Sequence, residues 1–181
     1  AAVTAIAATA DRSSTGVPAE PVAEFRFALD AGDPARLRAA VRSLVGLGHG
    51  STPGGDDVLC GALAGLIATH RDVLAEQLAA AALPDLATRT PLMSADLLRL
   101  AAAGHVCAEA DAVLRAVDAV SCGHSRGEAV LREALATLLA VGNTSGADLT
   151  TGLAIGLGVA PQPTPRRPRQ SPRSGATAAA R

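Results

Sequence analysis

The amino-acid sequence predicts a mainly α-helical fold with an internal pseudo-repeat, in which a glycine-rich loop is followed each time by a helix. No segment shows the period-two alternation of apolar and polar residues that is typical of a half-buried strand. The stretches Gly55–Leu66 and Gly146–Leu157 match in register at three glycines, one aspartate and their final leucine. Each follows a run of glycine and hydroxyl residues, so we expect the same local structure twice.

Helix-start and helix-stop signals place most of the chain in helices. Asp33-Pro34 is typical of an N-cap followed by proline at the first helical position, and it opens a helix through about Val45. The run from Ser125 to Glu128 matches the S-x-x-E capping box, and Gly142 follows that helix at its C-terminus. Further helices are expected over residues 19–31, 57–70, 72–83, 91–104 and 108–120, and from Asp148 onward.

The same signals divide the chain into three parts. We expect residues 1–18 to be poorly ordered, residues 19–160 to form one helical domain with both loop–helix motifs, and residues 161–181 to be a disordered tail rich in Pro and Arg. Residues 46–55 contain five glycines and one proline, so we expect a shaped loop there. The chain lacks an initiator methionine, which leaves open that it is a truncated piece.

Composition excludes several classes of partner. Phe25 and Phe27 are the only aromatic residues among 181, which argues against base stacking and single-strand nucleic-acid binding. Residues 1–160 hold all 17 acidic residues and 11 of the 16 Arg, a net charge of −6, so we expect no nucleic-acid partner. No apolar run reaches the ~20 residues that span a bilayer, so we expect no membrane partner. Three cysteines without a CxxC pattern favour a cytoplasmic location.

Aspartates at the start of both glycine-rich helices are the main functional signal. Asp56 and Asp57 follow the first loop, and Asp148 follows the second. Carboxylates at a helix N-terminus already complement the helix dipole, so a bare phosphate would be repelled at close range. They could cap their helices, accept hydrogen bonds from an amide or amine ligand, or hold a cation such as Mg²⁺ that bridges to an anion. The glycines four apart within each helix are most simply explained by close helix packing.

We therefore expect the two loops to meet at one small-ligand site. His49, Asp56 and Asp57 are the candidates for acid–base chemistry, and the catalytic residue itself is not assigned. No resident metal or cofactor is expected, although Mg²⁺ is compatible with the oxygen ligands. Glycine N–H groups, hydroxyls, an amide and a guanidinium would complete the substrate-binding set, which is Gly50, Thr52, Gly54, Gly55, Asp56, Asp57, Arg89, Asn143, Ser145 and Asp148.

Three segments resemble one bacterial domain family of unknown function, which includes the AllH-type subunit of oxamate carbamoyltransferase. Residues 44–61 resemble its L-I-G-L-G-P-G-L-T-P-S-G-D-D-F-L-x-G signature, with the G-L-G-x-G-x-T-P-x-G-D-D core starting at Gly46. Residues 90–104 are similar to its T-x-x-x-S-x-x-L-L-x-x-A-x-x-G stretch, and residues 145–152 to its closing S-G-x-D-x-x-x-G motif. His49 replaces the usual proline and Gly54 the usual serine, so one hydroxyl of the family's loop is missing here.

The resemblance implies a transferase subunit that works with two partner proteins in allantoin degradation and moves a carbamoyl group between oxamate and phosphate. Activity would then require the partner chains of a hetero-complex. Two other classes stay open. One is a non-catalytic ligand-binding or assembly subunit. The other is a Mg²⁺-dependent hydrolase of the ADP-ribosyl glycohydrolase kind, whose fuller set of aspartate motifs this chain lacks.

Overall fold

The computed structural model describes residues 2–10 and 13–158. Within these ranges the chain forms ten helices and no strand, which confirms the mainly α-helical prediction. None of the described helices has the length and apolar character needed to cross a membrane. The helices are α1 (Ala2–Ala10), α2 (Ala19–Ala31), α3 (Pro34–Leu44), α4 (Gly54–Ala68), α5 (Asp72–Ala82), α6 (Leu86–Arg89), α7 (Leu92–Ala102), α8 (Ala108–Ser121), α9 (Gly127–Leu139) and α10 (Ser145–Gly156).

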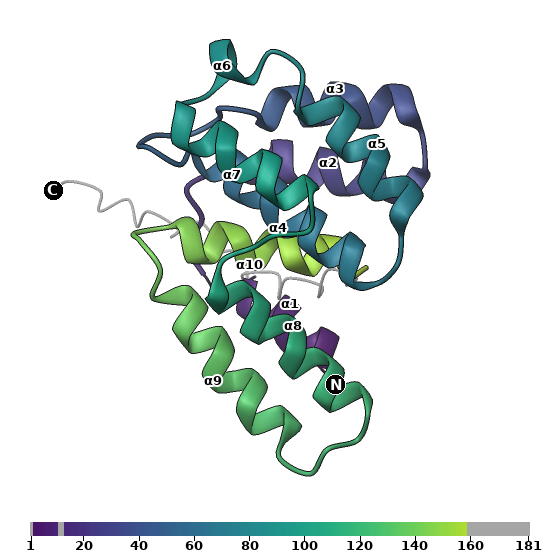
Figure 1. Ribbon diagram of the computed structural model, residues 1–181, viewed down its shortest axis with the longest axis vertical. Helices are drawn as coiled ribbons and strands as arrows, with labels where there is room; N and C mark the ends of the chain where they lie inside the picture. The colour runs from purple at the N-terminus through teal and green to yellow at the C-terminus, as the bar shows by residue number, and fades with distance from the viewer. Residues whose placement is uncertain (1, 11–12, 159–181) are drawn as a thin grey trace, which may run out of the picture.

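The two glycine-rich helices, α4 and α10, lie side by side in the middle of the molecule (Figure 1). They run in the same direction, because Gly61 packs against the backbone at Gly152 and Gly65 packs against Gly156, one turn later in each helix. A Cβ atom added to Gly65 would lie only 2.8 Å from the carbonyl carbon of Gly156. The glycines therefore allow direct backbone contact between the helices, as the sequence predicts. That the two motifs form an internal repeat stays a prediction.

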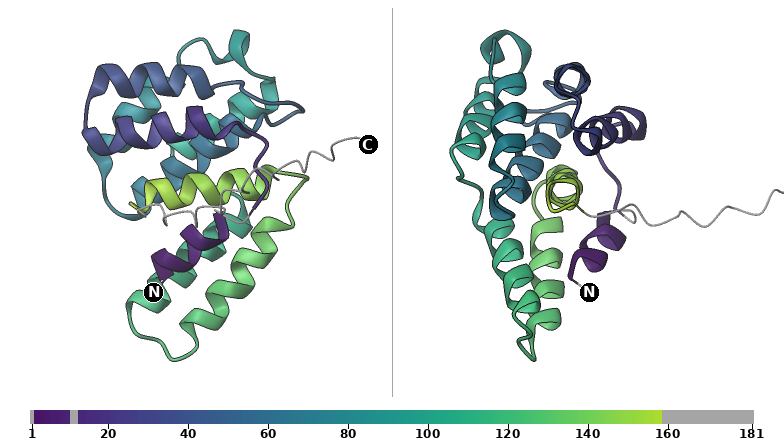
Figure 2. Two further views of the ribbon diagram at one scale, coloured as in Figure 1. Left: turned by 180° about the vertical axis from the view of Figure 1, so that it is seen from behind. Right: turned by 90° about the vertical axis from the view of Figure 1, so that its right-hand side faces the viewer.

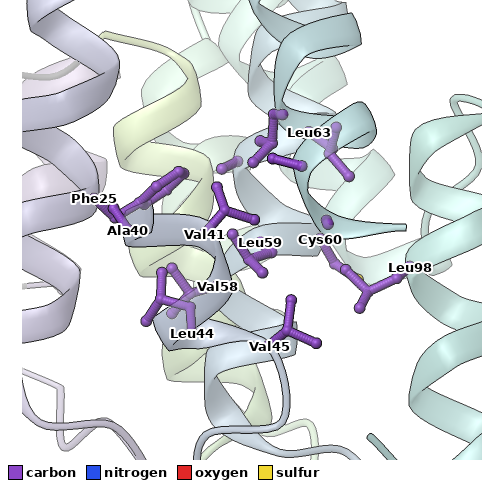
Figure 3. Close-up of a cluster of buried hydrophobic side chains, with 14 of the residues drawn as sticks. Phe25, Ala40, Val41, Leu44, Val45, Val58, Leu59, Cys60, Leu63 and Leu98 are labelled. Atoms are coloured by element: carbon purple, nitrogen blue, oxygen red, sulfur yellow. The ribbon is translucent and has the colours of Figure 1, made fainter. Parts of the chain in front are cut away.

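Two hydrophobic clusters cover opposite sides of this central pair. In one, α2, α3, α5 and α7 pack around α4, with Phe25, Val41 and Leu59 in its interior (Figure 3). In the other, α1 and the α8–α9 hairpin pack against α10, with Ile6 and Leu153 buried between them (Figure 2). Because α4 and α10 join the two clusters, the ends of this pair have a fixed position relative to the rest of the domain.

Helix α1 lies within the segment for which the sequence predicts little order. Its Ile6 is fully buried and its Ala2 is 5% exposed. The apolar contacts of α1 come from packing against α8, α9 and α10. The pattern of alanine and threonine residues within α1 does not predict these contacts. The predicted tail at 161–181 lies outside the described residues.

Helix starts differ from the prediction at three places, one of which is α10, which begins at Ser145 and not at Asp148. Asp33 does cap α3, accepting from the N–H of Ala35 at 2.9 Å. However, the predicted capping box of α9 is wrong, since that helix begins after Arg126 and no side chain caps it. Gly127 instead packs against α8, where an added Cβ would lie 3.0 Å from Val120 Cα. Helix α4 begins at Gly54, three residues before the expected start, so Asp56 and Asp57 lie inside its first turn.

Candidate functional site

The two glycine-rich loops meet where α4 and α10 begin. The hydroxyls of Thr52 and Ser145 are hydrogen-bonded at 3.2 Å, although 93 positions separate them in sequence. Gly46 and Gly48 have φ of 75° and 121°, which only glycine adopts readily, and these turns bring the first loop back onto the start of α4. The helix starts thus present three buried carboxyl groups, those of Asp56, Asp57 and Asp148, within one small region.

Asp56 is saturated by hydrogen bonds from the protein. It is 1% exposed. Its Oδ1 accepts from the Gly46 N–H at 2.8 Å, and its Oδ2 accepts from the Thr90 hydroxyl and from the Ser94 hydroxyl at 2.6 Å. Asp56 therefore ties the first loop to the start of α7. Because both of its oxygens already accept hydrogen bonds, the geometry gives it a positioning role.

Asp148 is also held by the protein. It is 0% exposed, and the Gly16 N–H donates to its Oδ1 at 3.0 Å and its Oδ2 at 3.2 Å. The hydroxyl of Thr144 lies close enough to this carboxyl group to lower its pKa. Gly54 lies directly against it, since an added Cβ would be 2.6 Å from Oδ2. Asp148 thus joins the segment before α2 to the starts of both central helices.

Asp57 differs from both neighbours. It is 5% exposed, and the hydroxyls of Ser145 and Thr52 lie near enough to its carboxyl group to oppose the rise of its pKa. Its Oδ2 atom is buried and has no hydrogen-bond partner among the described residues. A buried acceptor without a partner costs about 1–3 kcal/mol, more for a charged group. Asp57 is therefore the carboxyl group of this region that has an acceptor free for a bound molecule.

Burial and the neighbouring carboxylates shift the ionisation of this cluster. Burial is the main cause that raises the pKa of Asp57 to about 7, and the negative charges of Asp148 and Asp56 add to it, while the hydroxyls of Ser145 and Thr52 oppose it. Burial also raises the pKa of Asp148, against the opposing effect of the Gly16 N–H and the Thr144 hydroxyl. At neutral pH Asp57 is consequently present in both its protonated and its ionised form.

The other predicted site residues are placed around this centre in different ways. The Gly55 N–H donates to the Leu47 carbonyl at 2.9 Å and so closes the loop. The Arg89 guanidinium donates to the Arg42 carbonyl at 2.9 Å, at the C-terminal end of α3. His49, Gly50 and Asn143 lie exposed on the two loops. The structure therefore brings Thr52, Ser145 and the three aspartates together, with His49, Asn143 and Arg89 at the edge.

A family model described as oxamate carbamoyltransferase subunit AllH matches residues 44–157. The chain belongs to this family. Neither the comparison with curated proteins nor that with solved structures finds a match. The matched span runs from the last residue of α3 into α10, so the AllH-family region contains both loops, the central helix pair and the aspartate cluster.

No group of three or more His, Cys, Asp or Glu side chains in the described ranges has an arrangement that could hold a metal ion. A hollow of about 570 Å³ lies between α2 and α10, beside Phe27 and Thr151, and none of the predicted site residues lines it. A smaller cavity of about 230 Å³ is lined by Asp57 itself. Within the AllH-family region, the buried polar atom without a hydrogen-bond partner among the described residues is therefore Oδ2 of Asp57, a residue that lines this smaller cavity.

Several functional contacts lie outside the predicted site. Thr90 and Ser94 are four positions apart, so their side chains lie on the same side of the start of α7. Both hydroxyls donate to Oδ2 of Asp56. This spacing is the sequence signal that identifies them as partners of Asp56. For the bond between Gly16 and Asp148 the sequence has no such signal, because it joins residues 132 positions apart through a tertiary contact.

Proposed function

We propose that this AllH-family chain is the ligand-binding subunit of an oxamate carbamoyltransferase-type complex and that it holds the amide group of oxamate or of a carbamoyl donor at Asp57. The observation that carries the proposal is the buried, unpartnered Oδ2 of Asp57 beside the hydroxyls of Thr52 and Ser145. The family description names the enzyme and the subunit.

The chemistry of a primary amide matches this arrangement. An ionised Asp57 accepts from the amide N–H, and a protonated Asp57 can in addition donate its O–H to the amide carbonyl. Because the pKa of Asp57 is about 7, both forms are available at neutral pH. The hydroxyls of Thr52 and Ser145 can each donate or accept, so they can donate to the carboxylate of oxamate while its amide group faces Asp57.

The proposal includes partner subunits in the cytoplasm. Acceptance of a carbamoyl group by phosphate needs cationic groups, and the described residues lining the Asp57 cavity include no Arg. We therefore assign phosphate binding to a partner chain, so that the isolated chain binds ligand without turning it over. The three cysteines are free, which suits a reducing compartment.

Thermal unfolding of the purified chain with oxamate, carbamoyl phosphate or phosphate tests the binding step. At 100 times its Kd a ligand adds about 2.7 kcal/mol, which corresponds to a rise in Tm of roughly 5–10 °C for a domain of this size. We expect this rise with oxamate or carbamoyl phosphate, a loss of the rise in Asp57→Ala, and an unchanged rise in Asp72→Ala. Asp72 is the matched control because it is an exposed aspartate in the first turn of α5.

The catalytic part is tested by exchange. In an active oxamate carbamoyltransferase complex whose own AllH subunit has been removed, the wild-type chain should restore carbamoyl transfer and Asp57→Ala should not. Assembly without restored transfer would make the chain a structural subunit and overturn the proposal. Absence of any Tm shift with both amide ligands would contradict the binding step.

A further inference from the structure

We propose that Asp57 is also the polar end of an apolar cavity that binds a small aliphatic ligand carrying an N–H donor group. The ligand class is a primary amide or amine on an unbranched chain of about four to six carbons, larger and more apolar than oxamate. This inference deepens the proposed function and rests on it for the role of Asp57 as a ligand partner.

The cavity is defined by side chains from four parts of the chain. It has a volume of about 230 Å³ and lies between α4, α7, α10 and the connection from α7 to α8. Its walls are largely apolar, formed by Cys60, Leu97, Leu100, Val106 and Leu149, and Asp57 and the exposed His105 add polar groups. An apolar wall with few polar groups is the usual composition of a small-molecule site, and the volume falls somewhat below the ~300 Å³ typical for drug-sized ligands.

Asp57 gives this apolar space one specific contact. The residue is 5% exposed, and its Oδ2 has no hydrogen-bond partner among the described residues. Water is a poor occupant of an apolar cavity, because it finds too few polar partners there. A molecule that fills the cavity with carbon and brings one N–H to Asp57 satisfies the acceptor and also buries apolar surface.

The charges around the cavity select the head group. Asp57 lies close enough to Asp56 and Asp148 for both charges to act on it, and no Arg lines the cavity. A carboxylate ligand of the same length that brings its head group to Asp57 would meet like charge there. The one imidazole in the lining, that of His105, belongs to an exposed residue, whereas Asp57 is buried. An amide or amine has the donor that a carboxylate lacks, so the head group should decide binding.

The mouth of the cavity is open to solvent and offers a direct readout. Leu97 and Leu100 are 40% and 49% exposed, and Cys107 is exposed while it also lines the cavity. Cys122 is exposed too, but it lies at the far end of α8 and does not line the cavity. Occupancy should therefore protect Cys107 from thiol reagents and leave Cys122 unprotected.

The probes are pentanamide, n-pentylamine and pentanoate, which share their chain length and differ in head group. At about ten times its Kd a bound probe should slow alkylation of Cys107 roughly tenfold, measured by peptide mass spectrometry at pH 8. The rate at Cys122 should stay the same. We expect protection by pentanamide or n-pentylamine and none by pentanoate, and the same probes should raise the Tm of the full chain.

Two pairs of variants locate the site. Asp57→Ala should abolish protection by removing the partner of the head group, with Asp72→Ala as its control. Leu100→Trp should fill the mouth and block binding, whereas Leu92→Trp on the same helix should not, because Leu92 is 71% exposed and outside the cavity. Protection that survives Asp57→Ala, equal protection by pentanoate, or no protection by any probe would each overturn the inference.

Oxamate serves to separate the two proposals. A Tm shift with oxamate and none with the aliphatic probes would contradict the inference of an aliphatic-ligand site and leave the proposed function intact. Protection by pentanamide without any response to oxamate or carbamoyl phosphate would leave the cavity site and remove the carbamoyl assignment.

Discussion

Asp56 and Asp57 are adjacent in sequence, identical in chemistry and both buried in the first turn of α4, yet their surroundings are opposite. Asp56 faces the start of α7 and accepts from Gly46, Thr90 and Ser94. Asp57 faces the start of α10 and keeps one oxygen without a partner. Consecutive helical residues point about 100° apart, which is enough to place them against different elements. The two aspartates of a G-D-D motif can therefore differ completely in their hydrogen-bond partners.

The largest effect should come from removing the saturated carboxylate. Asp56→Ala leaves two hydroxyls and one N–H without their acceptor, and hydrogen bonds to a charged group contribute about 1.5–3 kcal/mol each. We expect the free energy of unfolding at pH 7 to fall by on the order of 3–5 kcal/mol in a urea titration. The exposed-helix control Asp72→Ala should lose less than about 1 kcal/mol. An equal fall in the free energy of unfolding in the two variants would mean that the hydrogen bonds of Asp56 do not stabilise the fold.

A smaller effect of opposite sign is expected at Asp57. Its pKa is about 7 in the folded chain, against an ordinary value of 3.8. Between these values the folded state keeps a proton that the unfolded state has released, so stability falls as pH rises through this window. Asp57→Asn removes this penalty, and at pH 8 it should stabilise the chain by about 1–3 kcal/mol after allowance for its own buried amide.

Urea titrations at pH 4 and pH 8 check the sign. Wild-type and Asp57→Asn should be closest in stability at the lower pH and furthest apart at the higher. A variant that is less stable than wild-type at pH 8 would show that the folded chain stabilises Asp57 in its ionised form.

The smallest effect should follow loss of a hydroxyl beside Asp57. The Ser145 hydroxyl lowers the pKa of Asp57 against the effect of burial. Ser145→Ala should therefore raise the pKa of Asp57 above about 7 and change overall stability by less than about 1 kcal/mol. An NMR titration of the side-chain carboxyl carbon measures this directly. A pKa that stays the same would place the Ser145 hydroxyl away from Asp57 in solution.

Local signals predicted the helices well and the packing only in part. Ala19–Ala31 was expected at its observed bounds, and Asp33-Pro34 marks the start of α3, because caps and prolines act over a few residues. The start of α4 was placed at Asp57, where acidic residues favour a helix start, although Pro53 already precedes the helix. Helix α1 depends on burial of Ile6 against distant helices, which no local pattern records.

The sequence predicted which loops form the candidate site, but it did not predict which contacts each aspartate makes there. Matching glycines and aspartates indicated that the loops before α4 and α10 belong together, and Thr52 and Ser145 do meet. The aspartates differ in their hydrogen-bond partners. These partners include Gly16, Thr90 and Ser94, which reach the aspartates through tertiary contacts. The cavity beside Asp57 is lined in part by the connection after α7. No sequence motif in that connection predicts a cavity.

The contact between Gly16 and Asp148 has a consequence for the order in which the protein is made. It joins positions 132 residues apart, and the glycine face of α4 likewise waits for α10. While the chain is being synthesised from its N-terminus, α2 to α5 can associate early, but the middle of the molecule stays open until residues 145–156 have emerged. Assembly of the aspartate cluster is thus a late step of biosynthesis, and a nascent chain interrupted before α10 has the first loop without its counterpart.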